Sequence, residues 1–213
     1  MKNKEKIIDI LKTSRVVLQS LTDLYSFPGS EFFNETAFGE DLLNLQTYLV
    51  RSELTESFSE LIEIFNTEDL EKLKIEYARL FIGPFHVVAP PYGSYYLENG
   101  RLMGESTIEV NNLYNQVGLV LNESFKDLPD HIIAELEFLI YLIHNQIDFI
   151  EKEEYDNYKT INDLKNYFIE SFFQNWVKKF NNVIIDKSEN IFFKKMANYS
   201  NNCIDFILNE TTN

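Results

Sequence analysis

The stretch that decides the fold closes a helical pattern and opens a loop, and it reads Glu76-Tyr77-Ala78-Arg79-Leu80-Phe81-Ile82-Gly83-Pro84. The loop continues as His86-Val87-Val88-Ala89-Pro90-Pro91-Tyr92-Gly93-Ser94-Tyr95-Tyr96-Leu97. A second stretch resumes the helical pattern with Asp127-Leu128-Pro129-Asp130-His131 and then Glu135-Leu136-Glu137-Phe138. Most of the 5 prolines and 7 glycines lie in or between these stretches. A long loop inside a compact domain usually serves a function or is disordered, so function is sought here first.

Outside the loop, apolar residues recur at helical spacing. The periodic segments are residues 4–26, 31–50, 53–66, 67–82, 106–118, a segment from Pro129 onward, 157–181 and 189–208. No alternating run of any length predicts a strand. The predicted fold class is therefore all-α, a single helical domain of roughly eight helices with one long loop rich in proline and aromatic residues. We expect one domain over residues 1–213, or an N-terminal lobe 1–82 and a C-terminal lobe 104–213 joined by the loop 83–103.

Three helix starts carry recognisable signals. Thr67 is placed to cap the helix that Gly83 ends. Ser106 and Glu109 have the spacing of a capping box. Pro129 suits the first turn of a helix, where the missing N–H is not needed.

The composition excludes several classes of protein. The formal charge is −15, from 19 Lys and Arg against 34 Asp and Glu, so a nucleic acid partner is not expected. Cys203 is the single cysteine, so no internal disulfide forms, and we expect a reducing, cytoplasmic location. No apolar run approaches the length of a membrane span, and the N-terminal residues do not form a signal peptide.

His131 and Glu135 are the one pair with the spacing of catalytic or metal-binding residues, four apart on one helix face. A zinc site needs further ligands, and no other histidine or cysteine is placed to supply them. Ser94 lacks a recognisable histidine or acidic partner, and no nucleotide-binding or hydrolase motif is present. Enzyme activity is therefore not predicted. The alternative for the pair is a helix start in which Asp127 and Asp130 complement the helix dipole.

The aromatic and proline residues of the loop admit two interpretations. They could form a rigid apolar plug over the helical core. They could also form one wall of a peptide-binding groove, because such grooves are often lined by aromatic side chains.

These motifs resemble those of the TorD/DmsD-type redox-enzyme maturation chaperones, a group that includes the nitrate reductase assembly chaperones. Residues 76–84 and 90–96 are similar to the family's Glu-x-x-x-Leu-Phe-x-Gly-Pro and Pro-x-x-Ser-x-Tyr segment. Residues 129–138 resemble its Pro-Asp-His-x-x-x-Glu-Leu-x-Phe signature. The similarity extends more weakly to Trp176–Phe180 and residues 192–197. Gln174-Asn175 stands where the family often has a histidine before the tryptophan, and Leu139 replaces its usual methionine.

The resemblance implies a cytoplasmic chaperone, not an enzyme, with no metal or other cofactor of its own. Its partners would be the twin-arginine signal peptide and the apo form of a molybdenum-containing reductase, which it would protect during cofactor insertion and hold back from premature export through the Tat pathway. It implies no stable membrane insertion, and a monomer or a domain-swapped dimer. The signal peptide would lie between two walls, the first formed by Tyr77, Leu80, Phe81, Pro84, Pro91, Tyr92 and Ser94, and the second by Pro129, Asp130, His131 and Glu135.

Two other functions remain open from the residues themselves. One is a helical adaptor that binds some other protein. The other is a metal-dependent hydrolase built on His131 and Glu135.

Overall fold

A computed structural model describes residues 2–49, 52–83, 86–122 and 125–211, and in these ranges the chain is all-α, as predicted. Within the described ranges, eight continuous helices have seven or more residues, and two of them contain a π-helical segment. None of the helices in the described ranges is long and apolar enough to cross a membrane. The elements are α1 (Lys2–Tyr25), α2 (Glu35–Tyr48), α3 (Glu53–Thr67), α4 (Leu70–Tyr77), η1 (Ala78–Ile82), α5 (Gly93–Leu97), α6 (Glu105–Gln116), α7 (Ile132–Glu151), α8 (Tyr155–Phe168), η2 (Ile169–Phe173), α9 (Gln174–Lys187) and α10 (Ile191–Thr211).

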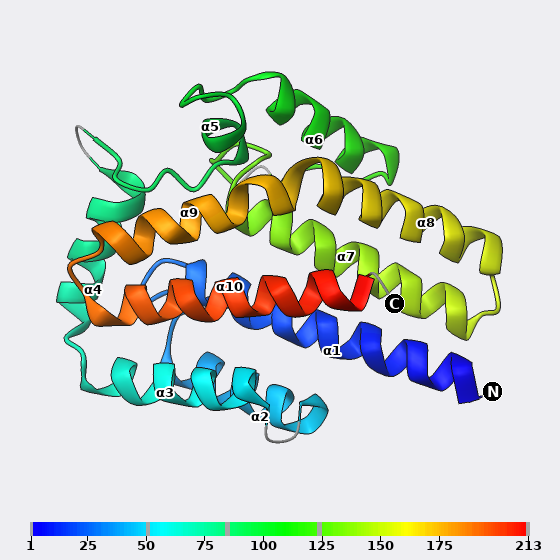
Figure 1. The fold of residues 1–213 in the computed structure, drawn as a ribbon, viewed down its shortest axis with the longest axis horizontal. Helices are drawn as coiled ribbons and strands as arrows, with labels where there is room; N and C mark the ends of the chain where they lie inside the picture. The colour runs from blue at the N-terminus through cyan, green and yellow to red at the C-terminus, as the bar shows by residue number, and fades with distance from the viewer. Residues whose placement is uncertain (1, 50–51, 84–85, 123–124, 212–213) are drawn as a thin grey trace.

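The helix α1 lies at the centre of the arrangement and packs on α7, α10 and α2 (Figure 1). The pair α2 and α3 covers one side, where α3 also packs on α10. The α8–η2–α9 rod runs along α7 and α10 on the other side. The short helices α5 and α6 lie over this rod, so the long loop of the sequence caps the bundle (Figure 1).

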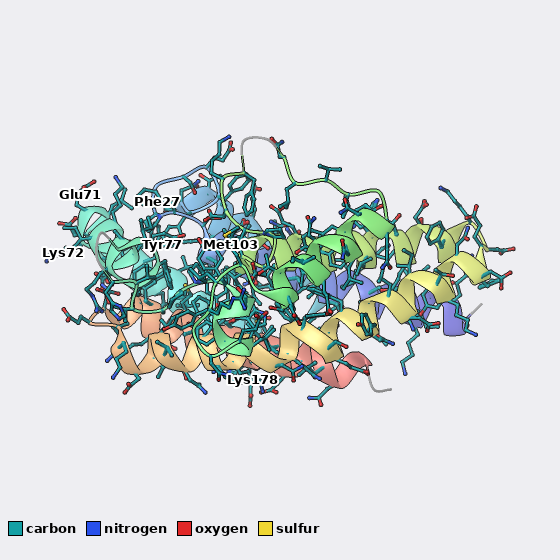
Figure 2. All side chains as sticks on the ribbon, turned by 90° about the horizontal axis from the view of Figure 1, so that it is seen from above. Phe27, Glu71, Lys72, Tyr77, Met103 and Lys178 are labelled. Atoms are coloured by element: carbon teal, nitrogen blue, oxygen red, sulfur yellow. The ribbon has the colours of Figure 1, made fainter. Side chains whose placement is uncertain are left out.

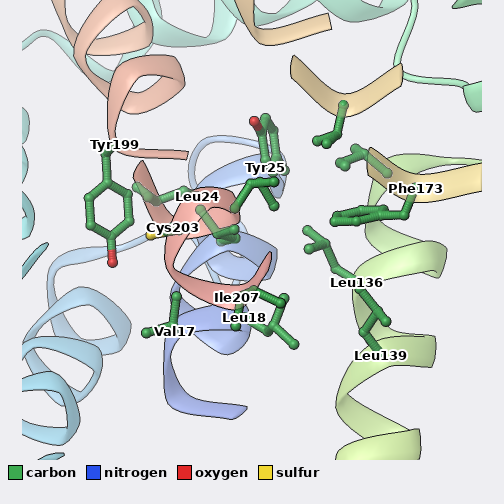
Figure 3. Packing of buried hydrophobic residues seen from close by; sticks show 14 of the residues in the cluster. Val17, Leu18, Leu24, Tyr25, Leu136, Leu139, Phe173, Tyr199, Cys203 and Ile207 are labelled. Carbon is green, nitrogen blue, oxygen red and sulfur yellow. The ribbon is translucent and has the colours of Figure 1, made fainter. Parts of the chain in front are cut away.

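Large apolar side chains from nearly every helix form one core cluster. Figure 3 shows Leu18 of α1, Leu136 of α7 and Ile207 of α10 converging in its centre, and all three are at most 4% exposed. A buried apolar side chain contributes about 1.5–3 kcal/mol relative to an exposed one. The apolar residues that recur at helical spacing are the ones buried in this core, which is why their spacing predicted the helices well.

A π-helical segment separates helix α4 from the long loop. Helix α4 continues into the π-helical segment η1, which closes with a bond from Gly83 N–H to Ala78 O at 2.7 Å. Gly83 has φ +51°, and a Cβ atom there would lie 2.7 Å from the carbonyl oxygen of His86. Both conditions require glycine. The loop then contains α5, a short helix that the sequence pattern did not predict.

The three predicted helix starts are wrong in detail. Asp69, not Thr67, caps α4 by accepting from Glu71 N–H, while Thr67 donates back to Ile64 O. Helix α6 begins at Glu105, and Ser106 instead hydrogen-bonds Glu98. Pro129 lies in a turn before α7, which begins at Ile132 with His131 as its cap.

A small polar network crosses the core and joins α1, α9 and α10. The amide nitrogen of Asn181 donates to Ser200 Oγ and to Asn201 Oδ1, both at 2.9 Å, and its Oδ1 accepts from the Tyr25 hydroxyl. Asn181 and Ser200 are 0% exposed. Because each of these groups depends on the others for a partner, the network selects one register among three helices.

Replacing Asn181 with alanine is expected to destabilise the protein by about 2–3 kcal/mol, because it leaves buried partners unsatisfied and opens a small cavity. For a chain of this size the melting temperature should fall by about 5–10 °C. Asn198→Ala on the exposed side of α10 is the control and should change stability by less than about 0.5 kcal/mol. Calorimetric melting curves of both variants test this, and equal effects would contradict the role of the network.

Candidate functional site

The two stretches that the sequence singled out meet in the structure. Tyr92 and His131 form an isolated antiparallel β-bridge. Gly93 N–H donates to Asp130 O at 2.8 Å, and Ile132 N–H donates to Pro91 O at 2.9 Å. The loop is therefore fastened by its backbone to the start of α7.

Asp130 joins the two stretches with its side chain as well. It is 1% exposed, and its Oδ2 accepts from the backbone N–H of Ser94 at 2.7 Å. Helix α5 has no capping side chain of its own at Tyr92, so Asp130 supplies that cap from a distant part of the chain. The remaining oxygen of Asp130 and the hydroxyl of Ser94 are buried and have no hydrogen-bond partner among the described residues.

His131 caps α7 itself. Its Nδ1 accepts from Ile133 N–H at 3.2 Å, and its ring packs against Tyr92 and Phe125 at centroid distances of 5.3 and 5.9 Å. Burial lowers the pKa of His131 to about 4, although the charges of Asp127 and Asp130 act in the opposite direction. The ring is therefore neutral at pH 7, which leaves Nδ1 able to accept the capping bond.

Glu135 lies one turn further along α7 and is 1% exposed. Its Oε2 accepts from the indole N–H of Trp176 at 2.9 Å. Burial raises the pKa of Glu135 well above the usual range, the Trp176 bond lowers it, and the charge of Asp130 raises it further. At Gly93 a Cβ atom would lie 3.0 Å from Trp176 Nε1 and 3.1 Å from Glu135 Oε1, so the loop packs against this pair only because residue 93 is a glycine.

The remaining predicted residues are distributed between the core and the edge of this junction. Tyr77 donates to Tyr25 O at 3.0 Å and packs edge-on against Phe27, its neighbour in Figure 2. Leu80 and Phe81 are 0% and 7% exposed and belong to the core. The hydroxyl of Tyr92 donates to Asp127 at 2.6 Å, and the carbonyl oxygen of Pro129 accepts from the Tyr114 hydroxyl at 2.8 Å. The last predicted residue, Pro84, lies outside the described residues.

A groove beside this junction was missed from the sequence. It has a volume of about 740 Å³ and runs between α7 and the segment that follows α6. We call it the α7 groove; it is lined by Glu31, Phe32, Tyr114, Leu119, Val120, Leu121, Asn122, Phe125, Ala134, Glu137, Phe138 and Tyr141. Val120 is 84% exposed and Phe32 52%, so apolar surface is presented to solvent. The apolar run 119–121, outside any helical period, was the signal available in the sequence.

The geometry gives no support to a hydrolytic or metal site at His131 and Glu135. One nitrogen of the imidazole is occupied by the helix cap, and one carboxylate oxygen by Trp176. Across the described parts of the chain, no three His, Cys, Asp or Glu side chains are grouped so that they could hold a metal ion. The junction is built to hold the loop against α7.

Glu135→Gln should change how stability depends on pH. Because the folded-state pKa of Glu135 is raised, its contribution to stability is complete below the unfolded pKa and is lost as pH rises toward the folded value. The loss is at most about 1.4 kcal/mol per pH unit. Gln keeps an acceptor for Trp176 without this loss, so E135Q should gain stability relative to wild type between pH 5 and pH 8.

Urea unfolding followed by fluorescence of Trp176, the single tryptophan, measures this difference directly. Glu135→Ala is the matched variant, because it removes the acceptor and should be less stable than wild type at pH 5. A difference between E135Q and wild type that stays constant over the whole pH range would contradict the raised pKa.

Known proteins with similar sequences carry related names. The chain is 27% identical over 143 residues to chaperone protein TorD of Aliivibrio fischeri, covering 64% of this chain and 65% of that protein. It is 30% identical over 91 residues to the Tat proofreading chaperone DmsD of Salmonella typhi, covering 42% and 45%. A third match, to TorD of Vibrio atlanticus, is 26% identical over 186 residues and covers 80% and 85%. The chain spans only about half to two thirds of the length of several similar proteins.

A crystal structure of a proposed redox enzyme maturation protein from Archaeoglobus fulgidus has a similar fold. The TM-score is 0.56 at 24% identity, with 91% of this chain and 93% of that chain covered. The family described as nitrate reductase delta subunit matches residues 36–182, which is more than half of the chain. The resemblance inferred from the motifs is confirmed, and the protein belongs to the nitrate reductase delta subunit family.

Proposed function

We propose that the protein is a non-catalytic chaperone that binds the twin-arginine signal peptide and the apo form of a molybdenum-containing reductase. It would protect the reductase while its cofactor is inserted and prevent premature Tat export. The observation that carries the proposal is the α7 groove, an open apolar channel with acidic residues in its lining, in a member of this family. The similar proteins named TorD and DmsD support the same function.

The shape of the groove suits the apolar part of a signal peptide. Ala134, Glu137, Phe138 and Tyr141 recur at helical spacing and form one face of α7, opposite the segment 119–122. A volume of about 740 Å³ lies within the range of pockets that bind small ligands, and it is open enough to take a few side chains of a longer peptide. Apolar peptides bind such channels as a helix or an extended strand.

The charge of the groove suits the basic part of a signal peptide. Glu31 and Glu137 line it and are exposed, so each can form a bidentate pair with an arginine side chain. The formal charge of −15 attracts a basic peptide over a longer range. A peptide with neighbouring arginine and apolar segments would therefore match both the acidic and the apolar residues of the groove.

The residues that the sequence predicted as walls of the peptide site have a supporting role in this proposal. Asp130 and Glu135 are each 1% exposed and hold the loop onto α7, so they support the groove from inside. Phe125 and Ala134 of the groove lie next to this junction in space or in sequence. A signal-peptide arginine could pair directly with Asp130 or Glu135 only if the loop lifted away from α7, because both carboxylates are buried.

Calorimetric titration with the twin-arginine leader of each molybdenum enzyme encoded in the same genome is the direct test. We expect one leader to bind, and a leader with lysine in place of both arginines to bind at least about tenfold more weakly, because lysine cannot form the bidentate pair. Raising the salt concentration should weaken binding, since exposed charges are screened. If every leader fails to bind, or the lysine leader binds equally well, signal-peptide recognition is wrong and an adaptor function replaces it.

Val120→Asp tests the position of the binding site. Val120 is 84% exposed, so the substitution should leave the fold intact while placing a charge in the apolar channel. We expect the affinity for the leader to fall about tenfold or more. Ile75→Asp on α4 is the matched control, because Ile75 is 70% exposed and lies outside the groove.

The control variant should bind the leader as the wild type does. Equal weakening by both variants would indicate a general effect of negative charge. No weakening by V120D, with the leader still bound, would move the site away from the α7 groove without removing the chaperone function.

A further inference from the structure

A second cavity lies on the other side of α7 and shares no residue with the α7 groove. It has a volume of about 430 Å³ and is enclosed by α1, α7 and the α8–η2 rod. We call it the Lys165 cavity. Successive residues of a helix are 100° apart, so Leu139, Ile143 and Gln146, which line the cavity, point roughly opposite to the α7 residues of the groove.

One part of the Lys165 cavity is polar and incompletely satisfied. Gln146 is 0% exposed; its nitrogen donates to Asn162 Oδ1 at 2.9 Å, but its Oε1 has no hydrogen-bond partner in the part of the chain that the structure describes. The Oδ1 of Asn166 is also buried without a partner. Buried polar atoms are nearly always paired in native proteins, so these two acceptors in the lining of one cavity are open to a donor from a bound molecule.

The same part of the cavity holds an unpaired cation. Lys165 is 7% exposed and has neither an ion-pair nor a hydrogen-bond partner within the described chain. Burial lowers its pKa to about 8, so at pH 7 most molecules still carry the ammonium charge. A buried charge without a partner is strongly unfavourable, and an anion beside it would relieve that cost.

The rest of the wall is mainly aliphatic, although Lys6, Ser14 and Tyr158 also line it. Ile7, Ile10 and Leu11 contribute from α1, and Leu139, Ile143 and Ile169 from the helices opposite. A cavity of this size, with a mainly apolar wall and a few convergent polar groups, has the usual character of a small-molecule site.

We propose that the Lys165 cavity binds a small apolar carboxylate that also carries an N–H or O–H donor next to the carboxylate, such as an apolar α-amino acid or 2-hydroxy acid. The carboxylate accepts from the ammonium of Lys165. An α-ammonium group has enough hydrogens to donate to both Gln146 Oε1 and Asn166 Oδ1, whereas a hydroxyl donates to one of them. The apolar side chain lies against the isoleucines and leucines of α1 and α7. No bond is made or broken, and the site is independent of the α7 groove.

Other ligand classes fit these groups less well. A simple fatty acid pairs with Lys165 but leaves both amide oxygens unsatisfied. A phosphate ester brings two negative charges to one buried cation, with the exposed Lys6 as the further lysine of the lining, in a protein of net charge −15. An amino acid amide has the donors but lacks the anion.

The test is titration calorimetry of the full chain with four probes of one carbon skeleton: leucine, 2-hydroxy-4-methylpentanoate, 4-methylpentanoate and leucinamide. We expect leucine or the hydroxy acid to bind, and 4-methylpentanoate and leucinamide to bind at least about tenfold more weakly. Binding of neither leucine nor the hydroxy acid at millimolar concentration would overturn the proposal and leave a water-filled cavity. Equal affinity for all four probes would also overturn it.

Variants assign the binding to the cavity. Lys165→Met should fold at least as stably as wild type, because it removes an unpaired charge, and should weaken binding at least tenfold. Ile10→Phe reduces the cavity volume and should weaken binding while Lys165 is intact. Lys159→Met, on an exposed position of the same helix, is the control and should bind as wild type does. Unchanged binding by both K165M and I10F would contradict this site.

Discussion

The indole N–H of Trp176 needs an acceptor inside the core, and the way Glu135 supplies it constrains much of the molecule. The bond ties α9 to the first turn of α7. It also fixes the depth at which the loop can pack, because Gly93 lies against both partners. With residue 93 in place, Asp130 can cap α5, and the Tyr92–His131 bridge aligns the loop with α7. A local hydrogen-bond requirement thus determines the position of the most irregular segment of the chain.

Helix α7 divides the protein into two environments. One face, with Phe138 and Tyr141, borders an open groove that presents apolar and acidic groups to solvent. The other face, with Ile143 and Gln146, borders an enclosed cavity near a buried cation. Both faces are carried by one rigid helix that packs on the central α1. The enclosed side is thereby kept apart from any peptide that occupies the groove.

The sequence predicted the helices well because burial follows the apolar period, as along α7, where Leu136, Leu139 and Ile143 are at most 2% exposed. It failed where a residue finds its partner far along the chain. Asp130 caps a helix 36 residues earlier, and this contact leaves no local signature. Lys165 lies among Asn162, Asp163 and Asn166, residue types typical of a solvent-facing surface, yet it is buried beside a cavity that residues of α1 also line. The α7 groove needs three separate segments, so no single stretch could indicate it.

The central position of α1 has a consequence for synthesis on the ribosome. Its apolar face is covered by α7 and α10, which begin about 110 and 170 residues after α1 starts its last turn. At about 5–20 residues per second, the nascent helix waits roughly 5–30 s for these partners. During that time Leu18, Leu21 and Leu24, all at most 1% exposed in the folded protein, can be covered only by earlier helices such as α2. A protein proposed to cover apolar surface of an unfinished partner therefore leaves part of its own apolar surface uncovered until α7 and α10 are synthesised.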